Sequence, residues 1–479
     1  MSRPTAYLPA AMTELTTHPW FFCGIGGSGM LPLALILRAH GAEIAGSDRS
    51  RDQGRSADKF AWLEAQGIRL FPQDGSGIVS AEQTLVASAA VESTVPEVVR
   101  ATELGCARMT RAELLARLFN AAPQGIAVGG TSGKSTVTGM LGWILHQAGR
   151  DPTIMNGTVM KNFVSADTPF ASARVGHGDA FVSEVDESDG SIALYRPAVA
   201  VLNNVSLDHK SLEELRALFA GFLAASERAA LNLDDAEAAA LIGHARGKLT
   251  FAVDRQDAML RIEPGSLVEG SASIAATLVD ARDGASHALE LKVPGRHNLA
   301  NALAAIAGAS LAGVAVADAV AALATFAGLA RRFDIVGTSA SGVTVIDDFG
   351  HNPDKVAATI ATLRATPGRI LAFFQPHGFG PLKQMGAELA RVLATRLGGE
   401  DVTLLCDPVY FGGTVDRSVS SEQVVEWIAQ AGGRAEHLPD RGACGDRLVE
   451  LARPGDRIVV MGARDDTLTG FARAILERV

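Results

Sequence analysis

The chain has 479 residues, of which 47% are hydrophobic and 5% aromatic, and its net charge is −10 at pH 7. This length predicts about three domains of ~150 residues each, and the composition is typical of a globular α/β protein. The negative charge excludes general attraction to nucleic acid or to an anionic membrane, so we expect neither as a partner.

The first glycine-rich loop, GIGGSGM at residues 24–30, lies between an apolar strand at 20–23 and a predicted helix. A second strand at 42–46 is followed by an acidic residue. A GxGxxG loop with an acidic residue about 20 positions later is typical of dinucleotide binding. Taken alone, this motif fits an NAD-dependent oxidoreductase, but the same loop can hold the diphosphate of another nucleotide. The expected contact residues are Gly24, Gly26, Gly27, Ser28, Gly29, Met30, Ser47 and Asp48.

A second glycine-rich loop, GTSGKST, lies between the apolar run at 126–128 and a helical pattern that extends to Leu145. Strand, glycine loop, Lys-Ser and helix form a cradle for nucleotide phosphates, because backbone N–H groups and the helix N-terminus attract anions. We expect Lys134 to reach the terminal phosphates and the Ser135 hydroxyl to bind Mg²⁺. Val128 occupies the position of the first glycine of the general Walker motif, so this loop is a shortened form. Its residues are Gly130, Thr131, Ser132, Gly133, Lys134, Ser135 and Thr136.

Two further strands of this segment end in polar residues. The strand at 180–183 is followed by the acidic run of residues 184–189, and the strand at 198–202 by a segment that contains Asp208 and His209. In phosphate-loop proteins the end of the first of these two strands commonly supplies the carboxylate that binds Mg²⁺. The alternative is a solvated acidic turn. Asp208 and His209 lie past the end of a strand, where open α/β sheets bind ligands.

The rest of the central segment contains a predicted β-rich insert at residues 249–291 and an alanine-rich helix that starts near Arg296. His297, Asn298 and Asn301 lie at positions i, i+1 and i+4 on one face of this helix, so they could contact one ligand.

The third segment begins at Arg331 and has strands at 342–346, 370–374, 402–405 and 458–461 with helices between them, which predicts a second doubly wound sheet. Asn352 and Pro353 are expected to cap and begin one of these helices. The predicted fold is therefore α/β with three domains. These are an N-terminal Rossmann-like domain at 1–120, a central P-loop ATPase-type parallel sheet with the small β insert at 121–330, and a C-terminal Rossmann-like domain at 331–479.

Several features predict a cytoplasmic protein. The four cysteines are far apart in the sequence and form no CxxC pair, which favours reduced thiols. The N-terminus has no basic region followed by an apolar core, so we expect no signal peptide. The uncharged stretch at 299–316 favours buried helices over a membrane span, because Asn301 and Ser310 interrupt it.

Two nucleotide-type loops in one chain argue against a simple dehydrogenase. The ordered set GIGGSGM, GTSGKST, SEVDESDGS, NNVSLDH, GRHNLANALAA, ARRFD, DDFGHNP, QPHGFGPLK and MGARDD resembles the Mur ligase family over almost the whole chain. The resemblance implies an ATP- and Mg²⁺-dependent ligase. It would join the carboxylate of a UDP-N-acetylmuramate-type nucleotide sugar to an amino acid or short peptide through an acyl phosphate. The N-terminal domain would bind the UDP-sugar, the central domain ATP, and the C-terminal domain the amine.

The resemblance also implies roles for individual residues. Lys134, Glu184, His209 and Arg332 would be catalytic, and His209 would serve a second Mg²⁺. The adenine side would meet His297, Asn298 and Asn301, while Arg332 and Asp348 would contact ATP from the third domain. His351 would lie near the sugar-peptide substrate, and His377 and Lys383 would be further substrate-binding residues of the third domain.

The loop after His377 departs from the pattern of the alanine-adding members, which carry arginines there. Here it has Gly378, Gly380 and a single basic residue, Lys383. An arginine fork matches a small carboxylate, whereas a lysine is a point charge. We therefore expect that L-alanine is not strongly preferred as the amine acceptor, with a clamp from Arg464 as the alternative that would retain L-alanine.

Two other protein classes are weighed against a ligase. A dehydrogenase would bind NAD(H) at the first glycine loop and would not need Lys134. A P-loop ATPase without ligase activity would hydrolyse ATP without a carboxylate substrate and would lack the first loop.

Overall fold

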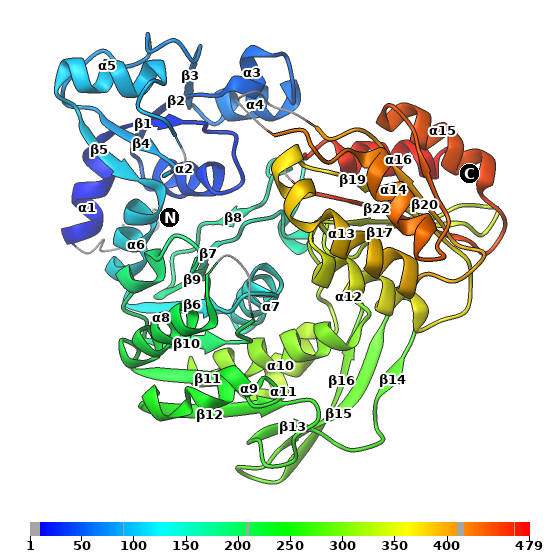
Figure 1. The fold of residues 1–479 in the computed structure, drawn as a ribbon. Coiled ribbons are helices and arrows are strands. Elements are labelled where there is room, and N and C mark those ends of the chain that lie inside the picture. Colours follow the sequence, from blue (N-terminus) through cyan, green and yellow to red (C-terminus); the bar gives the residue numbers. More distant parts are fainter. Residues whose placement is uncertain (1–9, 90, 207–209, 410–415, 464) are drawn as a thin grey trace. The chain divides into compact units, whose positions relative to one another are not determined.

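The computed structural model of the chain describes residues 10–89, 91–206, 210–409, 416–463 and 465–479 (Figure 1). Within these residues, three sheets with helices between their strands confirm the predicted α/β fold. The chain divides into two compact units. The first comprises residues up to Leu267, Ala275–Leu291 and Asn298–Ala327, and the second comprises Val268–Ile274, Lys292–His297 and Gly328–Val479. The boundaries expected near 120 and 330 stay predictions, because the first unit holds both the N-terminal sheet and most of the central sheet.

The N-terminal sheet is parallel throughout and has the order β3-β2-β1-β4-β5. Its strands are β1 (Pro19–Cys23), β2 (Glu43–Ser47), β3 (Arg69–Phe71), β4 (Thr84–Ala87) and β5 (Ala107–Thr110). The helices of this region are α1 (Ala10–Thr17), α2 (Met30–Ala39), α3 (Arg49–Asp52), α4 (Ala57–Ala65), α5 (Pro96–Leu104) and α6 (Arg111–Ala121). Phe21 and Phe22 of the central β1 are fully buried, as expected for a parallel sheet covered on both faces. The strand order reverses at β1, which places the first glycine loop at the crevice where such sheets bind ligands.

The central sheet has the order β14-β15-β13-β12-β11-β10-β6-β9-β7-β8, with β16 beside β15. Its strands are β6 (Gln124–Gly129), β7 (Thr153–Met155), β8 (Ala173–Arg174), β9 (Ala180–Glu184), β10 (Val199–Leu202), β11 (Arg228–Asn232), β12 (Gly247–Ala252), β13 (Leu260–Ile262), β14 (Val268–Glu269), β15 (Ile274–Asp280) and β16 (Ala285–Leu291). The helices of this region are α7 (Lys134–Gln147), α8 (Leu212–Ala224), α9 (Ala236–Ala240), α10 (Arg296–Leu311) and α11 (Val316–Leu323), with short 3-10 turns η1 (Lys161–Phe163), η2 (Ser191–Leu194) and η3 (Ile242–His244). β6 runs parallel to both of its neighbours, β9 and β10. The loops that follow these three strands therefore leave the sheet at the same edge.

The predicted β-rich insert extends this same sheet beyond β12. β13 is parallel to β12, and β15 is antiparallel to β13. Along β15 buried and partly buried residues alternate, whereas β10 is buried throughout, which distinguishes an outer strand from a central one. The apolar stretch at 299–316 lies mostly in the buried helix α10. Among the residues that the structure describes, no helix combines the length and apolar character needed to cross a bilayer.

The third sheet has the order β17-β18-β22-β19-β20-β21. Its strands are β17 (Asp334–Thr338), β18 (Thr344–Asp348), β19 (Ile370–Gln375), β20 (Val402–Leu405), β21 (Ala435–His437) and β22 (Arg457–Gly462). The helices of this region are α12 (Pro353–Arg364), α13 (Phe379–Arg396), α14 (Ser421–Gln430), α15 (Arg441–Leu451) and α16 (Leu468–Leu476). The edge strand β17 is antiparallel to β18, and the other strands are parallel. The cap predicted for α12 is confirmed, because Asn352 accepts a hydrogen bond from the Lys355 N–H at 2.9 Å and Pro353 is the first helical residue.

Candidate nucleotide and metal site

Three loops meet at the carboxyl edge of the central sheet. They are the phosphate loop (residues 130–136) after β6, the acidic loop (184–191) after β9 and the amide loop (203–206) after β10. In the register of the sheet, Val128 of β6 lies opposite Glu184 of β9. This register brings the candidate metal-binding carboxylate beside the start of the phosphate loop.

The phosphate loop depends on two glycines in a left-handed conformation. Gly130 has a φ of 133° and Gly133 a φ of 84°, a region that residues with side chains rarely adopt. A Cβ atom on Gly133 would also collide with the side-chain amides of Asn203 and Asn301. Helix α7 begins directly afterwards at Lys134, so its N-terminal N–H groups favour an anion at the loop.

Asn204 of the amide loop holds the phosphate loop in this shape. Its Oδ1 accepts hydrogen bonds from the Ser132 N–H at 2.8 Å and from the Thr131 hydroxyl at 3.0 Å, and its Nδ2 donates to the Ser132 carbonyl at 3.0 Å. The Thr131 hydroxyl also contacts the Ser206 hydroxyl at 2.8 Å. The sequence interpretation assigned Asn204 no role, although two consecutive amides directly after a strand are a signal of loop support.

Two asparagines of α10 extend this support, and both are buried. Asn301 accepts a hydrogen bond from Asn203 Nδ2 at 2.9 Å and donates one to Asn298 Oδ1 at 3.2 Å. His297 belongs to the second unit, where burial lowers its pKa. The structure thus shows Asn298 and Asn301 as part of the phosphate-loop scaffold, and the expected adenine contacts of all three residues stay a prediction.

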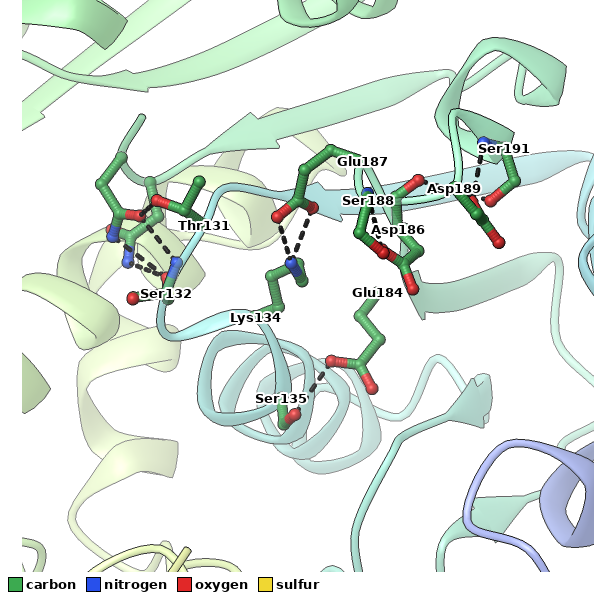
Figure 2. A network of polar contacts seen from close by, with 12 residues as sticks. Thr131, Ser132, Lys134, Ser135, Glu184, Asp186, Glu187, Ser188, Asp189 and Ser191 are labelled. Carbon is green, nitrogen blue, oxygen red and sulfur yellow. Dashed lines mark hydrogen bonds and ion pairs between the residues drawn. The ribbon is translucent and has the colours of Figure 1, made fainter. Parts of the chain in front are cut away.

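The two chemically active side chains of the phosphate loop face carboxylates of the acidic loop (Figure 2). Lys134 Nζ donates to both oxygens of Glu187, at 2.7 and 2.9 Å. The Ser135 hydroxyl donates to Glu184 Oε2 at 2.9 Å. The ion pair is largely withdrawn from solvent, with side-chain exposures of 19% for Lys134 and 6% for Glu187. Burial raises the pKa of the Glu187 carboxyl, and the nearby Lys134 ammonium opposes that rise.

The other acidic residues of this loop organise its backbone. Asp186 Oδ1 accepts hydrogen bonds from the Ser188 N–H at 2.9 Å and the Ser188 hydroxyl at 2.7 Å, and Asp189 Oδ1 accepts one from the Ser191 N–H at 2.9 Å (Figure 2). Such short-range bonds between Asp and a nearby N–H form tight turns. The loop therefore separates into two turn-forming aspartates and two glutamates that face the phosphate loop.

The oxygens of Ser135 and Glu184 suit a magnesium ion. Mg²⁺ prefers oxygen ligands and is usually held by one or two carboxylates together with substrate phosphates and water. Gly157 packs against Glu184, and a Cβ atom on Gly157 would collide with the Glu184 carboxylate. The glycine therefore leaves room for this carboxylate. No cluster of three His, Cys, Asp or Glu ligands occurs among the described residues. The expected third metal residue, His209, and its neighbour Asp208 lie outside them.

The first glycine loop is tied to the end of β2 by its backbone. The N–H groups of Gly24 and Ile25 donate to the Ser47 carbonyl at 2.8 and 3.0 Å, and the Gly27 N–H donates to the Gly24 carbonyl at 3.1 Å. Ser28 lies exposed in this loop, while Met30 begins α2 and packs into the core. The loop is thus a hydrogen-bonded turn whose tip, at Gly27 and Ser28, is exposed.

Asp48 and Ser47 both have bonding partners within the N-terminal domain. Asp48 Oδ2 accepts a hydrogen bond from the Gly26 N–H at 2.8 Å, and its Oδ1 accepts one from the Ser50 N–H at 2.8 Å. The Ser47 hydroxyl donates to the buried Glu97 at 2.7 Å. Asp48 therefore stabilises the glycine loop through its backbone. This role explains an acidic residue at position 48 without any contact to the ribose of a dinucleotide.

Arg111, which the sequence interpretation did not single out, connects this domain with the acidic loop. Its guanidinium lies 3.9 Å from Asp186 Oδ2, and its side chain occupies the space that a Cβ atom on Gly29 would need. Gly29 has an ordinary helical φ of −97°, so space for Arg111, and not backbone conformation, accounts for a glycine at this position.

In the second unit, Arg332 lies between two residues with left-handed backbone conformations, Arg331 with a φ of 59° and Phe333 with a φ of 47°. Non-glycine residues in this region store strain that often occurs at functional sites. The Arg332 guanidinium lies 4.5 Å from the centre of the Phe349 ring. Asp348 stabilises the turn by accepting a hydrogen bond from the Phe333 N–H at 2.7 Å.

The two histidines of the third domain line one small pocket. Their rings are perpendicular, with centres 5.3 Å apart, and Phe374, Pro376, Pro381, Leu382, Met385, Gly386 and Leu389 complete the lining. Burial lowers the pKa of His351 to about 3, so this imidazole is neutral at neutral pH. Its Nδ1–H donates to the Phe349 carbonyl at 3.0 Å, which leaves Nε2 as an acceptor. Lys383 instead forms an exposed ion pair with Asp416, so its expected contact with substrate stays a prediction.

The fold and this arrangement define a class of protein. A lysine and a serine on a phosphate loop, carboxylates on the neighbouring strand and a separate glycine-loop domain are the parts of an enzyme that uses a nucleotide triphosphate to activate a second substrate.

Comparison with known proteins identifies the family. Three family models match consecutive parts of the chain: "Mur ligase family, catalytic domain" at residues 21–122, "Mur ligase middle domain" at 128–309, and "Mur ligase, glutamate ligase domain" at 331–464. The UDP-N-acetylmuramate–L-alanine ligase of Pelotomaculum thermopropionicum is 35% identical over 454 residues, which cover 93% of this chain and 94% of that protein. The ligase of the same name from Kineococcus radiotolerans is 36% identical over 465 residues, 93% of each chain. The chain therefore belongs to the Mur ligase family and is an ATP- and Mg²⁺-dependent ligase.

Solved structures show the same fold. The UDP-N-acetylmuramate–alanine ligase of Thermotoga maritima has a TM-score of 0.78 and 24% identity, and covers 96% of this chain and 98% of its own. The murein peptide ligase of Psychrobacter arcticus has a TM-score of 0.70 and 25% identity, and the match covers 96% of this chain and 98% of that protein.

Proposed function

We propose that this ligase joins the carboxylate of a UDP-N-acetylmuramate-type nucleotide sugar to the amine of an amino acid or short peptide, in the cytoplasm and in peptidoglycan synthesis or recycling. The observation that carries the proposal is the pairing of Lys134 and Ser135 with Glu187 and Glu184, the side chains that we assign to phosphate and metal binding. The names of the two curated relatives support the sugar nucleotide.

The chemistry requires activation because a carboxylate is a poor electrophile. Transfer of the terminal phosphoryl group of ATP converts it to an acyl phosphate, and the reaction depends on positioning and on neutralisation of charge. Lys134 supplies a cation to the transferred group, and Ser135 and Glu184 hold Mg²⁺, with His209 as the proposed contact of a second ion. Arg332, presented by strained backbone, is the proposed cation from the third domain.

The amine then attacks the acyl phosphate, and we assign the third-domain pocket to this substrate. The neutral His351 offers its Nε2 as an acceptor for an N–H group of the amine, while His377 forms another wall of the pocket. A neutral imidazole favours this role because it does not repel an ammonium group as an imidazolium would.

The expected result is ADP release by the full chain only when ATP, Mg²⁺, UDP-N-acetylmuramate and an amine are all present. Calorimetry on the same protein should show binding of UDP-N-acetylmuramate and none of NADH, because Asp48 is engaged by backbone N–H groups of its own domain. NADH binding without a response to the UDP-sugar would favour the oxidoreductase, and ADP release without the UDP-sugar would favour a P-loop ATPase.

The identity of the amine gives a separate prediction. We propose that L-alanine is not strongly preferred, because residues 378–383 contain no arginine and Lys383 is paired with Asp416 at the surface. The names of the relatives favour L-alanine, and a clamp from Arg464, which lies outside the described residues, would retain it. The measurement is kcat/KM for L-alanine, other amino acids and a tripeptide. An advantage of L-alanine above about tenfold, or ~1.4 kcal/mol of transition-state binding, contradicts the proposal.

A further inference from the structure

Glu187 holds the lysine that the phosphates of ATP require. Both of its oxygens accept hydrogen bonds from Lys134 Nζ, and its side chain is 6% exposed. Carboxylate oxygens and phosphate oxygens both accept charge-assisted hydrogen bonds from an ammonium group. Glu187 therefore contacts Lys134 in the way that a phosphate group would. Because one ammonium has three N–H donors, phosphates must compete with this carboxylate for Lys134.

The acidic loop keeps Glu187 in place for this competition. The Asp186 bonds to Ser188 form a turn that contains Glu187, and the Asp189 bond to Ser191 forms a second turn directly after it. The Ser191 N–H lies at the start of the short turn η2, so the loop is fixed at its far end as well. The backbone of the loop that carries Glu187 is therefore held by hydrogen bonds within the loop.

We propose that Glu187 is a positioning residue that competes with the β- and γ-phosphates for Lys134 and thereby sets the affinity of the site for ATP and ADP. The proposal rests on the ATP site described above. In the nucleotide-free protein, the carboxylate neutralises Lys134. When nucleotide binds, Lys134 shifts its donors to the phosphates, and after phosphoryl transfer Glu187 recaptures Lys134, which favours release of ADP.

The test is calorimetric binding of ATP, ADP and AMP to the full chain with Glu187→Gln. This change keeps the size of the side chain but removes its charge. We expect ATP and ADP to bind about tenfold more tightly, the effect of one charged hydrogen bond. AMP lacks the β- and γ-phosphates, so its affinity should change by less than about twofold. A merely structural Glu187 would weaken all three nucleotides alike.

Two further variants separate the proposal from general effects. Glu213→Gln removes the same charge from an exposed position in the first turn of α8, outside the acidic loop, so ATP affinity should change by less than about twofold. Glu187→Asp keeps the charge but shortens the side chain, and should give an intermediate gain for ATP and ADP if Glu187→Gln does not fold.

Steady-state kinetics provide an independent readout. Glu187→Gln should lower KM for ATP together with kcat, because ADP leaves more slowly. Normal ATP binding by the unmodified protein with no gain in either Glu187 variant, or an equal gain for AMP, overturns the proposal. Absence of ATP binding in the unmodified protein overturns the ATP site itself, and the two failures are therefore distinguishable.

Discussion

Replacement of Lys134 with alanine is expected to lower UDP-sugar-dependent ADP release by at least about 100-fold, the usual effect of removing a preorganised group that stabilises transition-state charge. Lys134 begins α7 at the phosphate loop, where we expect its ammonium to neutralise the phosphates of ATP. The measurement is ADP release with saturating UDP-N-acetylmuramate and amine.

Loss of folding must be separated from loss of chemistry in this variant. The Lys134 side chain is only 19% exposed and is paired with the buried Glu187. Removing one partner of a buried pair leaves an uncompensated charge, so Lys134→Ala should reduce the free energy of unfolding. The double variant Lys134→Ala, Glu187→Gln removes both charges and should recover stability without activity.

Lys248 provides a matched control, because it is an exposed lysine on β12 of the same sheet. Lys248→Ala should leave ADP release within about twofold of the unmodified chain, as for most surface substitutions. Near-normal ADP release by Lys134→Ala would show that the phosphate loop has another role.

Replacement of Glu184 with glutamine is expected to raise the Mg²⁺ concentration needed for half-maximal activity by about 10- to 100-fold. In the unmodified chain the Ser135 hydroxyl donates to Glu184 Oε2 at 2.9 Å. Glutamine keeps an oxygen that can accept this hydrogen bond, but it lacks the negative charge that holds a hard cation. The measurement is a Mg²⁺ titration of ADP release at fixed ATP. We expect His209→Ala to act in the same direction.

Glu213→Gln is the control for this titration, since Glu213 is exposed in the first turn of α8. It should leave the Mg²⁺ curve unchanged. If the curves of Glu184→Gln and His209→Ala also coincide with that of the unmodified chain, the acidic loop has a structural role and the metal assignment is wrong.

Local patterns in the sequence determined the elements that carry the site. A glycine loop between a strand and a helix has few possible conformations, so the phosphate loop and the start of α7 follow from residues 126–136 alone. The cap at Asn352-Pro353 begins a helix through neighbouring atoms, and α12 starts where these residues predict. The resemblance of the ordered motifs was sufficient to indicate the Mur ligase family, which the comparisons confirm.

The tertiary structure decided which polar side chains meet. Lys134 and Glu187 are 53 residues apart, and Ser132 and Asn204 are 72 apart, so their contacts depend on the order β10-β6-β9 and on its register. Strand order is a property of the whole sheet and leaves no local signal, which is why the four acidic residues of one loop could not be divided into turn-forming and loop-facing groups from the sequence. The same holds for Arg111, whose place beside Gly29 and Asp186 exists only once the N-terminal and central sheets have formed.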